Sequence, residues 1–115
     1  MRVMVADDQP DVRSALRLML EEKPGITDIY EVSSSQELLK RVKADCPDLV
    51  LLDWELPGTG TDELLKSLRR QCSCVKVIAL SSRPQTRGIA LDCGADAFVC
   101  KSDPPETLLR AIDRV

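Results

Sequence analysis

The hydrophobic and polar positions along the chain follow two alternating patterns, a strand pattern and then a helix pattern, five times over. Short apolar or alternating runs predict strands at 2–6, 28–32, 49–52, 75–80 and 97–100. Apolar residues at helical spacing predict a helix after each strand. These helix residues are Val12, Ala15, Leu16, Met19 and Leu20, then Leu38, Leu39 and Val42, then Leu64, Leu65 and Leu68, then a weakly patterned stretch at 85–92, then Leu108, Leu109 and Ile112.

Residues that favour turns and helix ends divide these segments. Pro24-Gly25 ends the first predicted helix. Ser34, followed three residues later by Glu37, has the spacing of a capping box and predicts the start of the second helix. The segment 103–106, Asp-Pro-Pro-Glu, is typical of a helix start and predicts the fifth helix.

The order of these elements predicts an α/β fold. The first, third and fourth strands are continuous apolar runs, as expected for parallel strands covered on both faces. We therefore predict a doubly wound (βα)5 domain with a five-stranded parallel sheet in the order 2-1-3-4-5, spanning residues 1–115. Sheets of this kind bind ligands outside the carboxyl ends of their strands, where strands one and three separate.

Composition narrows the class of protein. The chain has 115 residues, a net charge of −3 and 43% hydrophobic residues, which is typical of one globular domain. The acidic balance argues against a surface dominated by nucleic-acid binding. No apolar run is long enough to span a membrane and no signal-peptide pattern opens the chain, so we expect a cytoplasmic protein without a membrane partner.

The cysteines do not form a recognisable framework. They are Cys46, Cys72, Cys74, Cys93 and Cys100. The odd number and scattered spacing are unlike a secreted disulfide scaffold, and the chain has no histidine to complete a metal site. We therefore expect reduced thiols that pack as small apolar groups.

Chemically active side chains follow four of the predicted strands. Asp7 and Asp8 follow the first strand, Asp53 the third, Ser81 the fourth and Lys101 the fifth. Each residue alone could serve a local purpose, such as capping a helix or forming a turn. Because parallel strands end at the same edge of a sheet, the predicted topology brings all of them together.

This set of side chains suits phosphoryl chemistry. Three neighbouring carboxylates raise one another's pKa unless a cation neutralises them, and a ligand set made only of oxygens favours Mg²⁺. Asp53 could then act as a nucleophile that forms an aspartyl phosphate. Lys101 could neutralise the transferring group and Ser81 could donate a hydrogen bond to it.

Four stretches carry a resemblance to a known family: VADDQPDVR, DLVLLDWELPG, VIALSS and GADAFVCKSDPPETLLRAI. Together they resemble the response-regulator receiver domain of two-component signalling over essentially the whole chain. The resemblance implies a flavodoxin-like fold. The segment after Lys101, with Ser102 where many receivers have proline, is most similar to receivers that carry a LuxR-type helix-turn-helix output domain.

The resemblance also implies a set of site residues. Asp53 would be the phosphoacceptor, and Mg²⁺ would be held by Asp8, Asp53 and the backbone carbonyl of Glu55, with Asp7 acting through water or hydrogen bonds. Ser81 would be the switch hydroxyl. Lys101 would contact the phosphoryl group.

Phe98, three residues before Lys101, would be the rotating aromatic residue of the family. A plain core phenylalanine remains the alternative interpretation of Phe98.

The function implied is signalling rather than enzymatic turnover of a substrate. A sensor histidine kinase would phosphorylate the domain, which would catalyse only its own phosphorylation and dephosphorylation. The face formed by the fourth helix, fifth strand and fifth helix would respond, by homodimerisation or by docking to an output domain. DNA would be contacted only through an output domain outside these residues, and we favour a segment of a longer transcription regulator over a stand-alone receiver.

The sequence departs from the family pattern beside the phosphoacceptor. The loop contains Thr61 where the family has glycine, so we expect Gly60 to supply a turn with positive φ. Glu55 and Arg83 flank the site with opposite charges, and we expect them to form an exposed ion pair over it.

Three other functions are compatible with parts of the pattern. Asp53-Trp54-Glu55 is similar to the nucleophile motif of haloacid-dehalogenase-type phosphatases, although those place it after the first strand. A flavin-binding module would use the same fold, but the acidic stretch after the first strand would repel the flavin phosphate. A receiver-like interaction module that is no longer phosphorylated is the third alternative.

Overall fold

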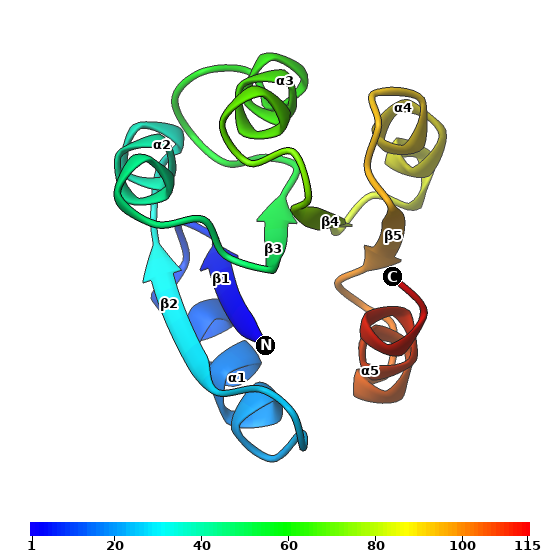
Figure 1. Ribbon diagram of the computed structural model, residues 1–115. Coiled ribbons are helices and arrows are strands. Elements are labelled where there is room, and N and C mark those ends of the chain that lie inside the picture. Colours follow the sequence, from blue (N-terminus) through cyan, green and yellow to red (C-terminus); the bar gives the residue numbers. More distant parts are fainter.

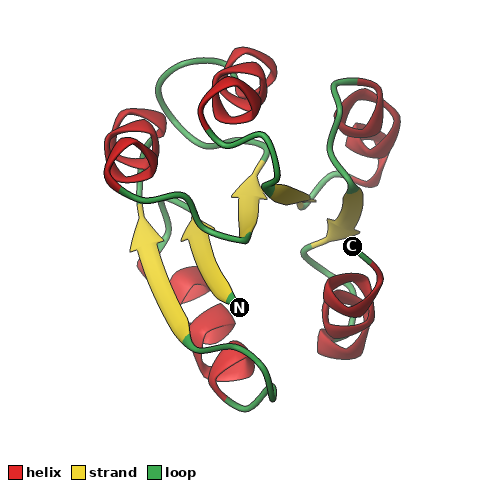
Figure 2. Cartoon of the chain, in the orientation of Figure 1, coloured by secondary structure: helices red, strands yellow, loops and turns green.

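A computed structural model describes all residues from 1 to 115 as one sheet with helices on both faces (Figure 1, Figure 2). The elements are β1 (Arg2–Ala6), α1 (Pro10–Glu21), β2 (Asp28–Val32), α2 (Ser35–Ala44), β3 (Leu49–Asp53), α3 (Thr61–Gln71), β4 (Lys76–Ser81), η1 (Pro84–Thr86), α4 (Arg87–Asp92), β5 (Ala97–Cys100) and α5 (Pro105–Arg114). The five strands are parallel in the order β2-β1-β3-β4-β5, which confirms the predicted topology. None of the helices has both the length and the apolar character needed to cross a membrane.

The sheet separates two hydrophobic cores. Helices α2, α3 and α4 cover one face and α1 and α5 cover the other (Figure 1). Along β3, Val50 and Leu52 point to the first core and Leu49 and Leu51 to the second, because successive side chains of a strand alternate between faces. All five residues of β3 are buried, as predicted for a strand covered on both sides.

The strands that carry the candidate site continue into it. The predicted strand at 49–52 is extended by one residue and the predicted strand at 75–80 is shifted by one residue, so that Asp53 and Ser81 belong to β3 and β4. Within the ladder Asp53 is paired with Leu80, and Ser81 with Cys100. Both side chains therefore start from backbone that the sheet holds rigidly.

The apolar stripe of α1 is less buried than its pattern predicts. Leu20 is fully buried, whereas Val12, Leu16 and Met19 are only partly covered and Ala15 is exposed. The four positions other than Leu20 line a surface hollow between α1 and α5. The stripe is therefore shared between the core and this hollow.

Helix ends follow the predicted signals with small shifts. Ser34 Oγ accepts the Glu37 N–H (3.2 Å), while the Glu37 carboxylate accepts the N–H of Ser33 (2.7 Å), one residue before the position of a standard capping box. The Asp103 carboxylate accepts the Cys100 N–H (3.0 Å) and so fixes the turn that carries Lys101.

The prediction that all cysteines are reduced is wrong for one pair. Cys46 and Cys72 form a disulfide, while Cys74, Cys93 and Cys100 are free. Cys46 lies just before β3 and Cys72 just before β4, and these strands are parallel neighbours. Their amino-terminal ends therefore bring the two Cα atoms to 5.8 Å, although 26 positions separate the residues along the chain.

The prediction that Gly60 supplies the positive φ is also wrong. Gly60 has a φ of −52° and is the N-cap of α3, whereas Gly58 has a φ of +114°. A Cβ on Gly58 would collide with Ser35 Oγ at the start of α2, so the loop needs glycine there for both conformation and space. Thr61 is instead the first residue of α3, where its hydroxyl donates to the Trp54 carbonyl (3.1 Å).

Candidate functional site

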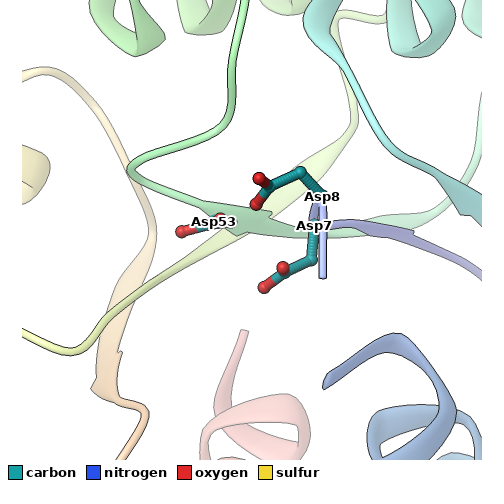
Figure 3. A group of neighbouring side chains, drawn as sticks. All are labelled: Asp7, Asp8 and Asp53. Carbon is teal, nitrogen blue, oxygen red and sulfur yellow. The ribbon is translucent and has the colours of Figure 1, made fainter. Parts of the chain in front are cut away.

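The carboxylates of Asp7, Asp8 and Asp53 gather at the carboxyl edge of the sheet, as predicted. Each offers an oxygen within 4.8 Å of the others (Figure 3). The cause is the register of β1 on β3, which pairs Ala6 with Leu52 and so places the next residue of each chain segment side by side. Asp7 and Asp53 are 1% and 2% exposed, whereas Asp8 is exposed, so the cluster opens to solvent on the side of Asp8.

Lys101 joins the two buried carboxylates. Its Nζ lies 2.7 Å from Asp7 Oδ2 and 3.3 Å from Asp53 Oδ1. Burial lowers the pKa of Lys101, but the hydrogen bond to Asp7 and the charges of Asp53 and Asp7 outweigh burial, so the pKa is raised overall. The ammonium group therefore stays charged beside the acids.

The carboxyl group of Asp53 is poorly solvated. Burial raises the pKa of Asp53 and the charge of Asp7 adds to this effect. The hydrogen bond from the Glu55 N–H (3.1 Å) and the charge of Lys101 oppose it, but the pKa remains raised overall. Additional positive charge at this point would therefore favour the ionised form.

Asp7 is also held by hydrogen bonds to residues at the start of α1. Its Oδ1 accepts the Gln9 N–H (2.9 Å), and its backbone carbonyl accepts from the Arg13 guanidinium (2.7 Å). The N-cap residue of α1 is Gln9, so neither Asp7 nor Asp8 takes the helix-capping role that their position also allowed.

Ser81 is fully buried, and its hydroxyl donates a hydrogen bond to the carboxylate of Glu55 rather than to an aspartate of the cluster. Ser81 Oγ lies 3.1 Å from each carboxylate oxygen of Glu55, and it accepts the Arg83 N–H (3.1 Å). The predicted ion pair between Glu55 and Arg83 is wrong. The Glu55 carboxylate accepts a hydrogen bond from the Ser81 hydroxyl, and Arg83 contacts the same hydroxyl through its backbone N–H. Thr86 Oγ1, 3.4 Å from Ser81 Oγ, is a further neighbour that the sequence did not reveal.

The family model of the response regulator receiver domain matches residues 3–113. The chain belongs to the response regulator receiver domain family. The predicted resemblance is thereby confirmed.

Individual relatives place this receiver domain among LuxR-type regulators. It is 32% identical over 117 residues to the transcriptional activator protein ExaE of Pseudomonas putida, covering 100% of the chain and 55% of that protein. It is 30% identical over 112 residues to the nitrate/nitrite response regulator protein NarL of Escherichia coli K12, covering 96% of the chain and 52% of that protein. The receiver domain thus spans about half the length of these relatives.

Solved structures agree with this placement. A LuxR-family two-component response regulator from Aurantimonas sp. SI85-9A1 superposes with a TM-score of 0.88 at 29% identity, covering 98% of the receiver domain and 82% of that chain. The response regulator protein TrrA from Thermotoga maritima, in complex with Mg²⁺ and BeF, superposes with a TM-score of 0.86 at 30% identity, covering 98% and 96%. Both similarities extend over nearly the whole receiver domain.

Phe98 lies in the core of the receiver domain. It is 6% exposed and belongs to the cluster on the α2–α3–α4 face of the sheet. The guanidinium carbon of Arg87, the first residue of α4, is 5.6 Å from its ring centroid. The core-phenylalanine interpretation describes this arrangement, and rotation of the ring stays a prediction.

The donor set of the receiver domain fits a hard divalent cation. Asp7, Asp8 and Asp53 supply only carboxylate oxygens, and no nitrogen or sulfur ligand belongs to the cluster. The single ammonium of Lys101 faces two buried carboxylates, so negative charge remains in excess. Mg²⁺ prefers such oxygen ligands and retains coordination places for other oxygens.

Proposed function

We propose that this receiver domain accepts a phosphoryl group on Asp53 from a sensor histidine kinase and passes the signal to an output domain. The observation that carries the proposal is the convergence of Asp7, Asp8 and Asp53 with Lys101 at one edge of the sheet. Mg²⁺ would be held by Asp8, Asp53 and the Glu55 carbonyl, with Asp7 acting through water. When bound, the ion supplies positive charge that neutralises the phosphoryl oxygens.

The reaction needs few groups from the protein. A carboxylate oxygen of Asp53 attacks the phosphorus of a phosphohistidine, the P–N bond breaks, and the imidazole nitrogen leaves with its electron pair and takes up a proton. Lys101, already within 3.3 Å of Asp53, stabilises the negative charge of the transferred group. Hydrolysis of the aspartyl phosphate by water releases inorganic phosphate and returns the carboxylate. The only reactions of the domain are then its own phosphorylation and dephosphorylation.

The switch begins at Ser81. To donate to the phosphoryl group, the hydroxyl of Ser81 must give up its hydrogen bond to Glu55. This movement displaces the end of β4, which is followed directly by η1 and α4. Helix α4 has only six residues and follows a 3-10 turn, which makes it the element most easily displaced. The face formed by α4, β5 and α5, including Phe98, would carry the change to a partner.

The partners follow from the relatives. The names of ExaE and NarL describe a transcriptional activator and a response regulator, and about half of each protein lies outside the region matched here. We propose that residues 1–115 form the receiver domain of such a cytoplasmic regulator, which contacts DNA only through an output domain. Homodimerisation on phosphorylation is part of this proposal.

Family membership does not favour the haloacid-dehalogenase-type phosphatase or the flavin-binding module. The experiment that tests the proposal is incubation with Mg²⁺ and acetyl phosphate, followed by intact-mass measurement. We expect one phosphoryl group per chain, dependent on Mg²⁺ and lost in Asp53→Asn. The matched control is Asp62→Asn, which changes an exposed acid at the start of α3.

Three outcomes would count against the proposal. Failure of the wild type to be labelled would favour the interaction module that is not phosphorylated. Undiminished labelling of Asp53→Asn would exclude Asp53 as the acceptor. Continuous turnover of acetyl phosphate at an enzyme-like rate would favour the phosphatase.

A further inference from the structure

We propose that the Cys46–Cys72 disulfide is a reversible redox site that sets the stability of the segment carrying Asp53. The bond joins the loop after α2 to the C-cap of α3. The covalent loop it closes therefore contains all of β3, the phosphoacceptor and all of α3.

The two cysteine residues differ in exposure. Cys46 is exposed and lines a surface hollow between the ends of α2 and α3, whereas Cys72 is 4% exposed and packs in the core on the α2–α3–α4 face. An incoming thiolate can therefore reach the sulfur of Cys46, and Cys72 is the leaving group.

The reductant would be a low-molecular-weight thiol of the glutathione class. Its thiolate attacks Cys46 Sγ, the bond between the two protein sulfurs breaks, and Cys72 leaves as a thiolate that takes up a proton. A second thiolate attacks the mixed disulfide, releases the small-molecule disulfide and returns Cys46 as a thiol. Oxidation runs in reverse: one small-molecule disulfide is reduced to two thiols while the protein disulfide forms.

The backbone holds the two cysteines in place without the bond. Asp48 donates its N–H to the Arg2 carbonyl (2.9 Å) and accepts the Lys76 N–H (3.0 Å), which ties the chain after Cys46 to the start of β4. The Cys72 N–H donates a hydrogen bond to the Leu68 carbonyl in α3 (2.7 Å). The Cα separation of 5.8 Å lies within the usual range for disulfides, so the pair can close and open without refolding.

In the reduced state, the S–H group of Cys46 has two possible hydrogen-bond acceptors nearby. The Gln71 carbonyl lies 3.5 Å from Cys46 Sγ and the Val42 carbonyl lies 3.9 Å from it. Either carbonyl can accept the S–H of a reduced Cys46. The S–H of a reduced Cys46 therefore has an acceptor within the folded domain.

A disulfide at this position would respond to the redox state of the cell. This conclusion rests on the proposed function, which places the regulator in the cytoplasm. Small thiols keep most cysteines reduced in that compartment, and disulfides found there are usually transient or sensing ones. Closing the loop restricts the unfolded chain and so stabilises the folded domain. Because both cysteines lie at the amino ends of β3 and β4, opposite Asp53, the bond should change stability while leaving the phosphoryl chemistry intact.

The test is alkylation with N-ethylmaleimide and intact-mass measurement of the protein equilibrated in glutathione buffers of graded ratio. With denaturant present during alkylation in both cases, three of the five cysteines should be modified after equilibration in oxidising buffer and all five after equilibration in reducing buffer. The melting temperature should fall by roughly 10 °C on reduction. Cys46→Ala should melt like the reduced wild type and show no redox dependence.

A matched control is Cys74→Ser, which removes an exposed cysteine two residues from Cys72 and should keep the full redox shift. Modification of all five cysteines in oxidising buffer, or an unchanged redox shift in Cys46→Ala, would overturn the proposal. Asp53→Asn separates this proposal from the proposed function: the redox shift should persist in that variant whether or not the wild type is phosphorylated.

Discussion

The hydroxyl of Ser81 lies 3.1 Å from both carboxylate oxygens of Glu55. Glu55 is two residues beyond Asp53, and Ser81 ends the neighbouring strand β4. In the proposed mechanism the same hydroxyl has to reach the phosphoryl group on Asp53. Glu55 therefore competes with the phosphoryl group for the only proton that Ser81 can donate.

Removing this competitor should favour the activated state. We expect Glu55→Ala to bind beryllofluoride, with Mg²⁺ present, about tenfold more tightly, since a hydrogen bond to a charged group contributes about 1.5–3 kcal/mol. Glu55→Gln keeps an acceptor but loses the charge, so its affinity should lie between those of wild type and Glu55→Ala. Fluorescence titration of Trp54 measures the affinity, and weaker binding by Glu55→Ala would contradict the competition.

Replacing Lys101 should destabilise the fold through its buried partners. Lys101→Met leaves Asp7 and Asp53 facing each other without a cation, and removal of one partner from a buried ion pair costs about 3–5 kcal/mol. Lys66→Met, which breaks an exposed pair with Glu63, should cost less than about 1 kcal/mol. Urea unfolding at pH 7 compares the two variants, and equal losses would argue against the role of Lys101.

The raised pKa of Asp53 predicts how stability depends on pH. A carboxyl group whose pKa is higher in the folded state than the usual 3.8 favours folding when protonated, and this contribution is lost as the pH rises through the raised pKa. Asp53→Asn, which cannot ionise, should therefore be more stable than wild type at pH 7 without Mg²⁺. The difference should shrink as the pH falls toward 4.

Glu31 provides a control of opposite sign for that measurement. Its hydrogen bond with Arg17 is the main cause that lowers the pKa of Glu31 below the usual 4.5, and Arg13 adds to the effect. Its contribution to stability is present above that usual pKa and is lost as the pH falls through the lowered one. Glu31→Gln should thus be less stable than wild type at pH 7, and a pH series of urea unfolding curves that moves both variants in the same direction would refute the assignment.

Arg83 should influence the lifetime of the phosphoryl group although it forms no ion pair with Glu55. Arg83 is exposed, and its backbone N–H donates to the hydroxyl of Ser81. We expect Arg83→Ala to shorten the lifetime of the aspartyl phosphate roughly two- to fivefold, because an exposed charge contributes less than about 1 kcal/mol. Arg70→Ala, at the far end of α3, is the control, and an autodephosphorylation rate of Arg83→Ala equal to that of wild type would end this idea.

Two glycines should respond to alanine in opposite directions. Gly58→Ala places a Cβ against Ser35 at a φ of +114° and should cost about 2 kcal/mol or more. Gly88→Ala lies in α4 with open space around the new Cβ, and should stabilise the domain by about 1 kcal/mol. Thermal unfolding measures both effects, and a harmless Gly58→Ala would show that the loop can relax away from α2.

The sequence by itself determined the order of the strands and helices along the chain and, to within one residue, where each strand ends. Periodicity identifies a strand such as 97–100 because burial on a sheet imposes a repeat that is visible locally. The cluster of Asp7, Asp8, Asp53 and Lys101 also followed, because parallel strands in the order 2-1-3-4-5 place their carboxyl ends together.

The tertiary structure alone decided which side chains contact one another around that framework. The Cys46–Cys72 bond depends on the register of β3 against β4, and their shared position just before adjacent strands was the one sequence signal available. Glu55 turned to Ser81 rather than Arg83, and Gly58 rather than Gly60 adopted positive φ because α2 packs against the loop. These contacts join segments distant in sequence, so local patterns contain no information that selects one partner over another.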